Sequence, residues 1–170
     1  MAQQDKTTHA INLLVADHRT VEDLFEKFEK AKGAAAKQKI VQNICTELKV
    51  HAQIEEEIFY PALRGKVEED MLDEATVEHD GAKLLINDLE SAAPDEAFYD
   101  AKVMVLQEQI EHHVKEEEKQ NGSLFTQARR TDVDLEALGQ KMAARKAELM
   151  AMAKAGGLPA AEFQAVDQHG

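Results

Sequence analysis

Two histidine–glutamate pairs mark the positions whose residue types and spacing suit chemistry. His51 precedes Glu55 by four residues, and His113 precedes Glu117 by the same interval. Residues four apart lie on one face of an α-helix, so each pair can present an imidazole nitrogen and a carboxylate oxygen together. Both groups bind transition metals. The two pairs therefore predict a metal site if their side chains face the protein interior.

Apolar stripes place both pairs, and two further histidines, on the inward faces of four helices. In each of four segments, core-facing residues recur at alternating intervals of three and four, which is the seam of a helix packed in a bundle. The stripes are Ile11, Leu14, His18, Val21, Phe25 and Phe28; Val41, Ile44, Leu48, His51, Glu55 and Ile58; Leu72, Ala75, His79, Ala82, Ile86 and Leu89; and Val103, Leu106, Ile110, His113 and Glu117. An unpartnered buried glutamate is costly, so two inward glutamates beside four inward histidines predict a bound cation.

Two alternatives accompany this interpretation. His112 and Glu116 have the same spacing as His113 and Glu117, but only His113 continues the apolar stripe of its helix. We therefore predict His113 and Glu117 as the inward pair, with His112 and Glu116 as the alternative. Taken singly, an inward histidine is more often a satisfied core residue than a metal ligand.

The other polar residues near the two pairs are given simpler roles. The flanking glutamates are predicted to lie on solvated helix faces; they are Glu56, Glu57, Glu116 and Glu118. Tyr60 is predicted to pack in the core, with a place near the metal as the alternative.

The elements that must position these residues are helices throughout. Ala, Glu, Lys, Leu and Gln dominate, and they are good helix formers, whereas the chain has only three prolines and eight glycines. Breaks are predicted near Gly33 and near residues 61–65, 91–95 and 121–122. The predicted fold class is all-α, an up-down-up-down four-helix bundle with an additional C-terminal helix.

Chain distances predict that the four histidines share one level of the bundle. The first and third lie 15 residues before a predicted turn, at Gly33 and Pro94, and the second and fourth lie 18 and 19 residues after it. At about 1.5 Å per residue, these arms are roughly 22 to 28 Å long. The two halves also repeat, since the first and third histidines are 61 residues apart and the second and fourth 62. Two similar hairpins facing each other predict a site for two metals.

The stretches DHRTVEDLF, HAQIEEEIFYPAL, VEHDGAKLLI and HHVKEEE resemble the hemerythrin-like HHE cation-binding family over residues 10 to about 130. The resemblance implies a four-helix bundle that holds two non-haem iron ions joined by an oxo or hydroxo bridge. The iron ligands it implies are His18, His51, Glu55, His79, His113 and Glu117. Imidazole and carboxylate together suit iron, whereas zinc usually takes four ligands, often thiolates.

One departure from the family pattern bears on function. Oxygen carriers of this family have a further histidine one turn after the third, and Lys83 holds that position here. This weakens the oxygen-carrier interpretation and favours a site that reacts, autoxidises or senses. The predicted function is uptake of O2, NO or peroxide in sensing or response. The alternatives are an enzyme that decomposes peroxide or reduces NO, and an iron buffer or structural bundle; no catalytic residue is predicted.

The end of the fourth helix also departs from the family. Polar residues 119–123, which include a turn-prone Asn-Gly, follow Glu117 where the family continues with an apolar residue, Phe and Pro. The helix is predicted to end or bulge within about a turn of Glu117, which would leave that glutamate mobile or reshape its surroundings.

We predict three parts in the chain: the di-iron bundle over residues 1–130, a C-terminal helix packed on it over residues 131–155, and a flexible tail over residues 156–170. The apolar stripe of the C-terminal helix is predicted to cover one side of the bundle, with a dimer contact as the alternative. The expected assembly is a monomer or a weak homodimer.

Charge and composition narrow the possible partners. The chain has 33 acidic against 20 basic residues and a formal charge of −13, which argues against nucleic acid or an anionic membrane surface. No apolar run is long enough to span a membrane, and the single cysteine allows no internal disulfide. The expected partner is a small diatomic ligand or peroxide, and the expected location is the cytoplasm.

Overall fold

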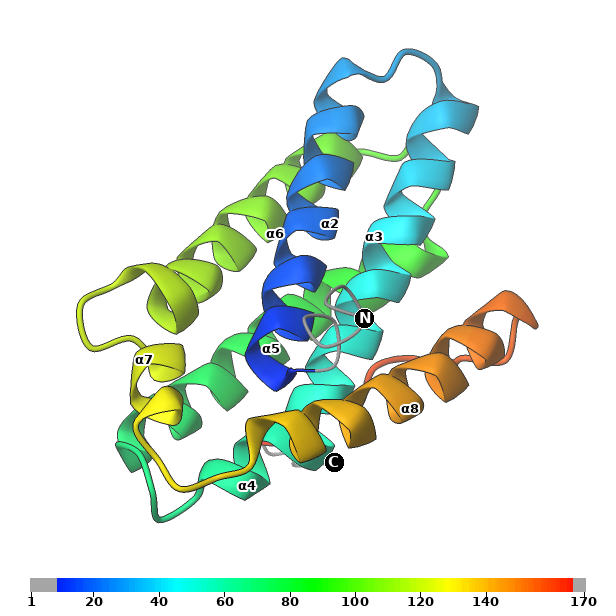
Figure 1. Ribbon diagram of the computed structural model, residues 1–170. Helices are drawn as coiled ribbons and strands as arrows, with labels where there is room; N and C mark the ends of the chain where they lie inside the picture. The colour runs from blue at the N-terminus through cyan, green and yellow to red at the C-terminus, as the bar shows by residue number, and fades with distance from the viewer. Residues whose placement is uncertain (1–8, 167–170) are drawn as a thin grey trace.

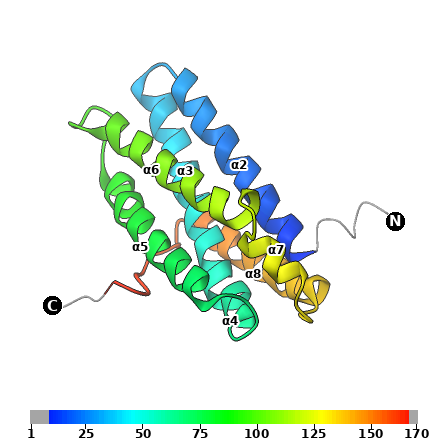
Figure 2. The same cartoon turned by 90° about the vertical axis from the view of Figure 1, so that its left-hand side faces the viewer.

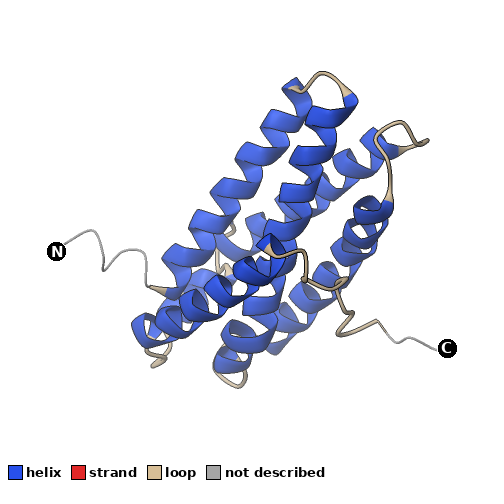
Figure 3. Cartoon of the chain, turned by 90° about the vertical axis from the view of Figure 1, so that its right-hand side faces the viewer, coloured by secondary structure: helices blue, strands red, loops and turns tan. Residues whose placement is uncertain are grey.

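Two long helical hairpins form the core of the structure, a computed structural model that describes residues 9–166. Helices joined by loops and turns make up the described residues (Figure 3). The bundle helices are α2 (Ala10–Lys30), α3 (Ala34–Ile54), α5 (Glu69–Ser91) and α6 (Tyr99–Val114) (Figure 1). Helix α2 packs on α3, α5 on α6, and α3 on α5. The predicted four-helix bundle is confirmed.

The connections between the helices fall at the predicted breaks. Gly33 joins α2 to α3 with a φ of 92°, a left-handed conformation that glycine adopts without steric cost. Gly122 has a φ of 73° in the predicted Asn-Gly turn after the fourth helix. The first turn joins the paired helices α2 and α3, and the second leads from the end of the fourth helix to the helix that begins at Leu124. Within the described residues, no helix is both long and apolar enough to cross a membrane.

Helices α3 and α6 each continue into a π-helical turn at the glutamate of the sequence pair. These turns are η1 (Glu55–Phe59), which leads into α4 (Tyr60–Leu63), and η2 (Lys115–Lys119). In each turn the backbone hydrogen bonds span five residues, as from Gln120 N–H to Lys115 O at 2.9 Å. Such turns are rare and occur frequently at functional sites. The predicted bulge near Glu117 is therefore present, and a matching one that the sequence did not indicate lies at Glu55.

Two apolar clusters fill the bundle above and below the level of the histidines. One cluster includes Leu14, Phe59 and Phe125, and the other includes Val21 and Ile86. Along α2, His18 lies between Leu14 of the first cluster and Val21 of the second. The histidine level is thus a polar layer between two dry layers.

Two further helices cover the end of the bundle where the first cluster lies. They are α7 (Leu124–Arg129), capped by the Ser123 side chain, and α8 (Leu135–Lys154). Helix α8 packs across α2 and α3 (Figure 1). The apolar residues on its inner face are buried in the first cluster; they are Leu135, Leu138, Met142 and Leu149. The predicted additional C-terminal helix is therefore part of the same core.

The chain then returns to the bundle along α5 (Figure 2). Residues 156–170 were predicted to be a flexible tail. In the structure, the backbone of Ala161 in this stretch makes two hydrogen bonds with the Asn87 side chain of α5, at 3.0 and 2.8 Å. Asp80 accepts hydrogen bonds from the backbone N–H groups of residues 164–166. The remainder of the predicted tail, residues 167–170, lies outside the described residues.

Candidate metal centre

All six predicted ligands meet in the polar layer at the middle of the bundle. Their exposed fractions are 6% or less, and Glu55 is fully buried. They form two groups of four whose ligand atoms lie within 4.8 Å of one another. One group is His18, His51, Glu55 and Glu117; the other is Glu55, His79, His113 and Glu117. The two glutamates, Glu55 and Glu117, belong to both groups.

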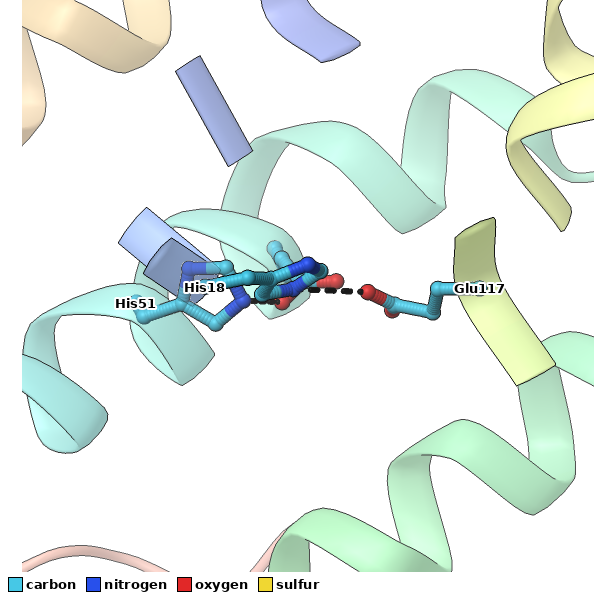
Figure 4. A group of neighbouring side chains, drawn as sticks. His18, His51 and Glu117 are labelled. Carbon is cyan, nitrogen blue, oxygen red and sulfur yellow. Dashed lines mark ion pairs between the residues drawn. The ribbon is translucent and has the colours of Figure 1, made fainter. Parts of the chain in front are cut away.

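The inward nitrogen of each histidine is Nε2. The Nε2 of His18 lies 3.3 Å from Oε2 of Glu117, and Figure 4 shows His18 and His51 side by side with Glu117 facing them. On the other side of the layer, the Nε2 atoms of His79 and His113 are 3.1 Å apart. His113 Nε2 also lies 3.0 Å from Oε1 of Glu117. The four imidazoles therefore converge on the two shared carboxylates.

Several of these inward atoms are buried and make no hydrogen bond of good geometry, although some of them face each other as ion pairs, as His18 Nε2 and Glu117 Oε2 do. They are Nε2 of His18 and His51, both carboxylate oxygens of Glu55, and Oε2 of Glu117. Buried polar atoms almost always have partners, because each one left alone costs free energy. A cation between them would satisfy all of these atoms at once. The donor set, imidazole with carboxylate and no thiolate, fits a transition metal ion.

The pKa values in the layer show how its charges balance. Burial lowers the pKa of His51, but the carboxylates of Glu55 and Asp17 outweigh it and raise the pKa to about 10. Burial also lowers the pKa of His113, yet Glu117 and Glu78 bring it well above its usual value. Without an ion, the imidazolium protons of His51 and His113 thus offset the glutamate charges, whereas burial lowers the pKa of His18. A bound metal cation would supply positive charge in place of those protons.

The outward nitrogen of each histidine, Nδ1, contacts a carboxylate on a neighbouring helix. The Nδ1–oxygen distances are 3.0 Å for His51 to Asp17, 2.9 Å for His79 to Glu56, 3.3 Å for His113 to Glu78 and 2.6 Å for His18 to Glu118. We call these four residues the outer carboxylates. Such contacts fix the tautomer and orientation of a metal-binding imidazole, with Nε2 directed inward.

The sequence interpretation missed the outer carboxylates. Glu56 and Glu118 were predicted to be solvated, but each holds a histidine and is only partly exposed. A signal was present, since every outer carboxylate is adjacent in the sequence to a predicted ligand. This adjacency did not reveal their role, because each outer carboxylate contacts a histidine on another helix and not its neighbour in the sequence.

Three of the outer carboxylates also form ion pairs with cationic side chains. Lys146 of α8 pairs with Asp17, and Arg19 pairs with Glu118. Lys83 of α5 contacts Oε1 of Glu56 at 2.6 Å. These pairs hold the carboxylates in place against the imidazoles.

The alternative pair on the fourth helix turns outward. His112 is 62% exposed and contacts Glu116 at 3.1 Å and Glu78 at 3.4 Å. His113 and Glu117, by contrast, lie inside the layer, as the apolar stripe indicated. Position within the stripe, and not spacing alone, separates the two pairs.

Tyr60 reaches the layer from α4. Its hydroxyl donates to Oε1 of Glu117 at 2.7 Å and lies 3.3 Å from Nε2 of His79. The residue does pack in the first cluster, as predicted, but it also contacts two candidate ligands. Burial, followed by the charge of Glu117, raises the pKa of Tyr60 well above its usual value, so the hydroxyl keeps its proton.

A small cavity borders the centre on the side of the second cluster. Its volume is about 30 Å³, and it is lined by the four histidines, by apolar side chains of the four bundle helices, and by Asp17 and Lys83. About 10–15 Å³ is enough for one water molecule. The Lys83 ammonium contacts Glu56, Asp80 and the Glu162 carbonyl. The position of the family's extra histidine therefore contributes a lysine that is already paired.

Comparisons with known proteins find a similar fold and a matching family. A solved structure, an HHE cation binding domain-containing protein of Mycobacterium kansasii that is a homologue of Rv2633c, superposes with a TM-score of 0.71 at 24% identity, over 88% of this chain and 94% of that one. A DNA nickase from Nostoc sp. (strain PCC 7120 / SAG 25.82 / UTEX 2576) is 28% identical over 102 residues, which is 60% of this chain. The chain spans only 29% of the length of that nickase. Residues 9–124 match the family described as the hemerythrin HHE cation binding domain. Together with the buried histidine and glutamate groups, this match shows that the chain belongs to the hemerythrin HHE cation-binding family.

Proposed function

We propose that the buried layer binds two iron ions and takes up O2, NO or peroxide in a sensing or response role. The observation that carries this proposal is the pair of overlapping four-residue groups that share Glu55 and Glu117. Two carboxylates that belong to both groups would be available to two neighbouring ions. Mixed imidazole and carboxylate ligands without thiolate support iron over a structural zinc site.

Bound iron would supply open coordination positions and a reversible change of oxidation state. The protein's part is to shape the surroundings of those positions. The outer carboxylates hold the imidazoles, and Tyr60 donates a hydrogen bond to Glu117. The cavity beside the histidines is lined almost entirely by apolar surface, which favours a small neutral ligand over an ion.

The enzymatic alternative, peroxide decomposition, has one observation in its favour. The Tyr60 hydroxyl lies within the ligand layer and keeps its proton, because burial and Glu117 raise its pKa. A peroxide held at the centre would meet a hydrogen-bond donor there. Ligand sensing and peroxide turnover would use the same residues. The two functions must therefore be distinguished by experiment.

The test begins with protein purified in air. We expect about two irons per chain and a visible spectrum that dithionite bleaches. Addition of O2 or NO should then restore or shift the bands reversibly if the site binds ligands. Sustained evolution of O2 from added peroxide would establish the enzyme instead. A colourless protein that holds zinc would contradict both.

The nickase relative does not change this proposal. The similarity covers a minor part of that protein, and the charge of −13 disfavours contact with nucleic acid. We therefore do not extend its activity to this chain.

A further inference from the structure

Lys83 is an unusual residue because its charged side chain is buried beside the candidate metal centre. It is 4% exposed. Its ammonium contacts Oε1 of Glu56 at 2.6 Å, the carbonyl of Glu162 at 2.8 Å and Oδ1 of Asp80 at 3.4 Å. A buried ammonium is costly unless it is paired and hydrogen-bonded. Lys83 therefore joins η1, through Glu56, and the chain around Glu162 to its own helix α5.

The first tie leads directly to a candidate ligand. Glu56 uses Oε1 for Lys83 and Oε2 for Nδ1 of His79, at 2.9 Å. The opposite nitrogen of the same ring, Nε2, faces the centre and lies 3.1 Å from Nε2 of His113. A carboxylate that is itself held in place fixes the ring it contacts. Lys83 thus acts on His79 through Glu56.

The other two ties lead to the C-terminal segment, which we define as residues 159–166. Asp80 accepts backbone N–H groups from Gln164 at 2.9 Å, from Ala165 at 2.7 Å and from Val166 at 2.7 Å. The Glu162 carbonyl accepts from Lys83 itself. The segment therefore covers the lysine and completes its set of acceptors.

A pocket of about 220 Å³ lies where the segment meets α3, η1 and α5. Its lining includes Glu56, Lys83 and the segment's Pro159 and Gln164. If the segment left its place, solvent would reach the contact between Lys83 and Glu56 directly. Water competes with such a pair and weakens it.

The arrangement differs between the two halves of the centre. On the side of His18 and His51, the outer carboxylates pair with Lys146 and Arg19, whose side chains are 30% and 44% exposed. The C-terminal segment makes its hydrogen bonds with α5, on the side of His79. Any effect of the segment should therefore fall on one ion position more than on the other.

We propose that Lys83 and the C-terminal segment position His79 through Glu56, so that the segment sets how tightly one of the two ion positions holds its metal. The proposal rests on the proposed metal function for its readout, since it concerns the ligands of that centre. Lys83 is a positioning residue in this scheme and does not bind the metal.

The variants are Lys83→Met, which removes the ammonium but keeps the stem, and a chain that ends at Gly157. Lys49→Met is the matched control, because Lys49 is also a buried lysine beside the same pocket, but it pairs with Glu90 and contacts no candidate ligand. Lys83→Arg tests rescue, since a guanidinium can also bind a carboxylate. Thermal melting of each variant separates loss of positioning from loss of fold.

The measurement is release of the bound metal to a chelator. We expect two phases in Lys83→Met and in the shortened chain, with half of the metal leaving about tenfold faster than in the wild type. Lys49→Met should behave like the wild type, and Lys83→Arg should recover much of the slow phase. Equal release from Lys83→Met and Lys49→Met, or uniform acceleration of both ions, would overturn the proposal.

A second readout does not depend on metal identity. In the metal-free protein, Lys83→Met should speed hydrogen exchange at the amides of residues 164–166, because the segment loses its tie through Glu162. Unchanged hydrogen exchange at these amides would also count against the proposed positioning of His79 by Lys83 and the C-terminal segment. If the wild-type protein holds no iron, the proposed function fails. The release experiment is then run with cobalt or zinc, which tests the positioning role of Lys83 and the C-terminal segment separately.

Discussion

Each candidate ligand histidine uses its two ring nitrogens in different ways. Nε2 points into the layer, and Nδ1 contacts an outer carboxylate. That these histidines face the interior of the bundle could be predicted from sequence, because three- and four-residue intervals define a helix face. The contacts of Nδ1 with the outer carboxylates could not be predicted, because they join distant positions in the sequence. His18 and Glu118, for example, are 100 residues apart. Neighbours on a helix are readable from sequence, whereas neighbours between helices depend on how the helices pack.

Removal of one shared carboxylate tests the centre at this scale. We expect Glu55→Ala to lower the metal content by at least one ion per chain, because Glu55 belongs to both ligand groups. Elemental analysis of the purified protein measures the loss.

The matched control is Glu57→Ala. Glu57 lies two residues further on, is exposed and pairs with Arg145 of α8 instead of with a histidine. It should keep the full metal content and lose at most about 1 kcal/mol of stability. Full metal in both variants would show that the ligand assignment is wrong.

At the scale of elements, the two π-helical turns stand out because they occupy equivalent places in the two hairpins. Each one begins within the turn that follows a ligand histidine and contains the shared glutamate. The sequence indicated only the second, from the polar residues after Glu117. The turn at Glu55 spans the residues EEEIF and has no Asn-Gly pair beside it to indicate a bulge. Their shared position suggests that the need to bring Glu55 and Glu117 into the layer, and not local propensity, selects this geometry.

Helix α8 is held on the bundle by its apolar face, and Met142 at the centre of that face is completely buried. We expect Met142→Ala to reduce the free energy of unfolding by about 2–5 kcal/mol, because it leaves a cavity in the first cluster. Denaturant unfolding measures the change.

Met104→Ala is the control for this substitution. Met104 lies on α6 and is 59% exposed, so its truncation should change stability by no more than about 0.5 kcal/mol. If the two variants were equally stable, α8 would not be docked as described.

At the scale of the whole molecule, a polar layer lies between two apolar clusters that each pack without it. We therefore expect the metal-free protein to stay helical at room temperature by circular dichroism. Loss of the ligand-linked stabilisation, about 4 kcal/mol when metal exceeds its Kd a thousandfold, should lower Tm by roughly 8–16 °C.

A chelator titration followed by thermal melting measures this shift. Glu55→Ala serves as the comparison, because a variant that has already lost an ion should respond less to the chelator. Complete unfolding on chelation would instead mean that the two clusters do not sustain the bundle.

The outer carboxylates also have a directional order around the bundle. Asp17 of α2 contacts a histidine of α3, Glu56 after α3 contacts one of α5, Glu78 of α5 contacts one of α6, and Glu118 after α6 contacts one of α2. This circuit is closed, so the seams between the hairpins carry as many such ties as the seams within them. A slide of one hairpin past the other by a single residue, about 1.5 Å, would strain two ties at once. The helices are thereby locked against axial shear, and a ligand arriving at the centre meets a frame that resists sliding.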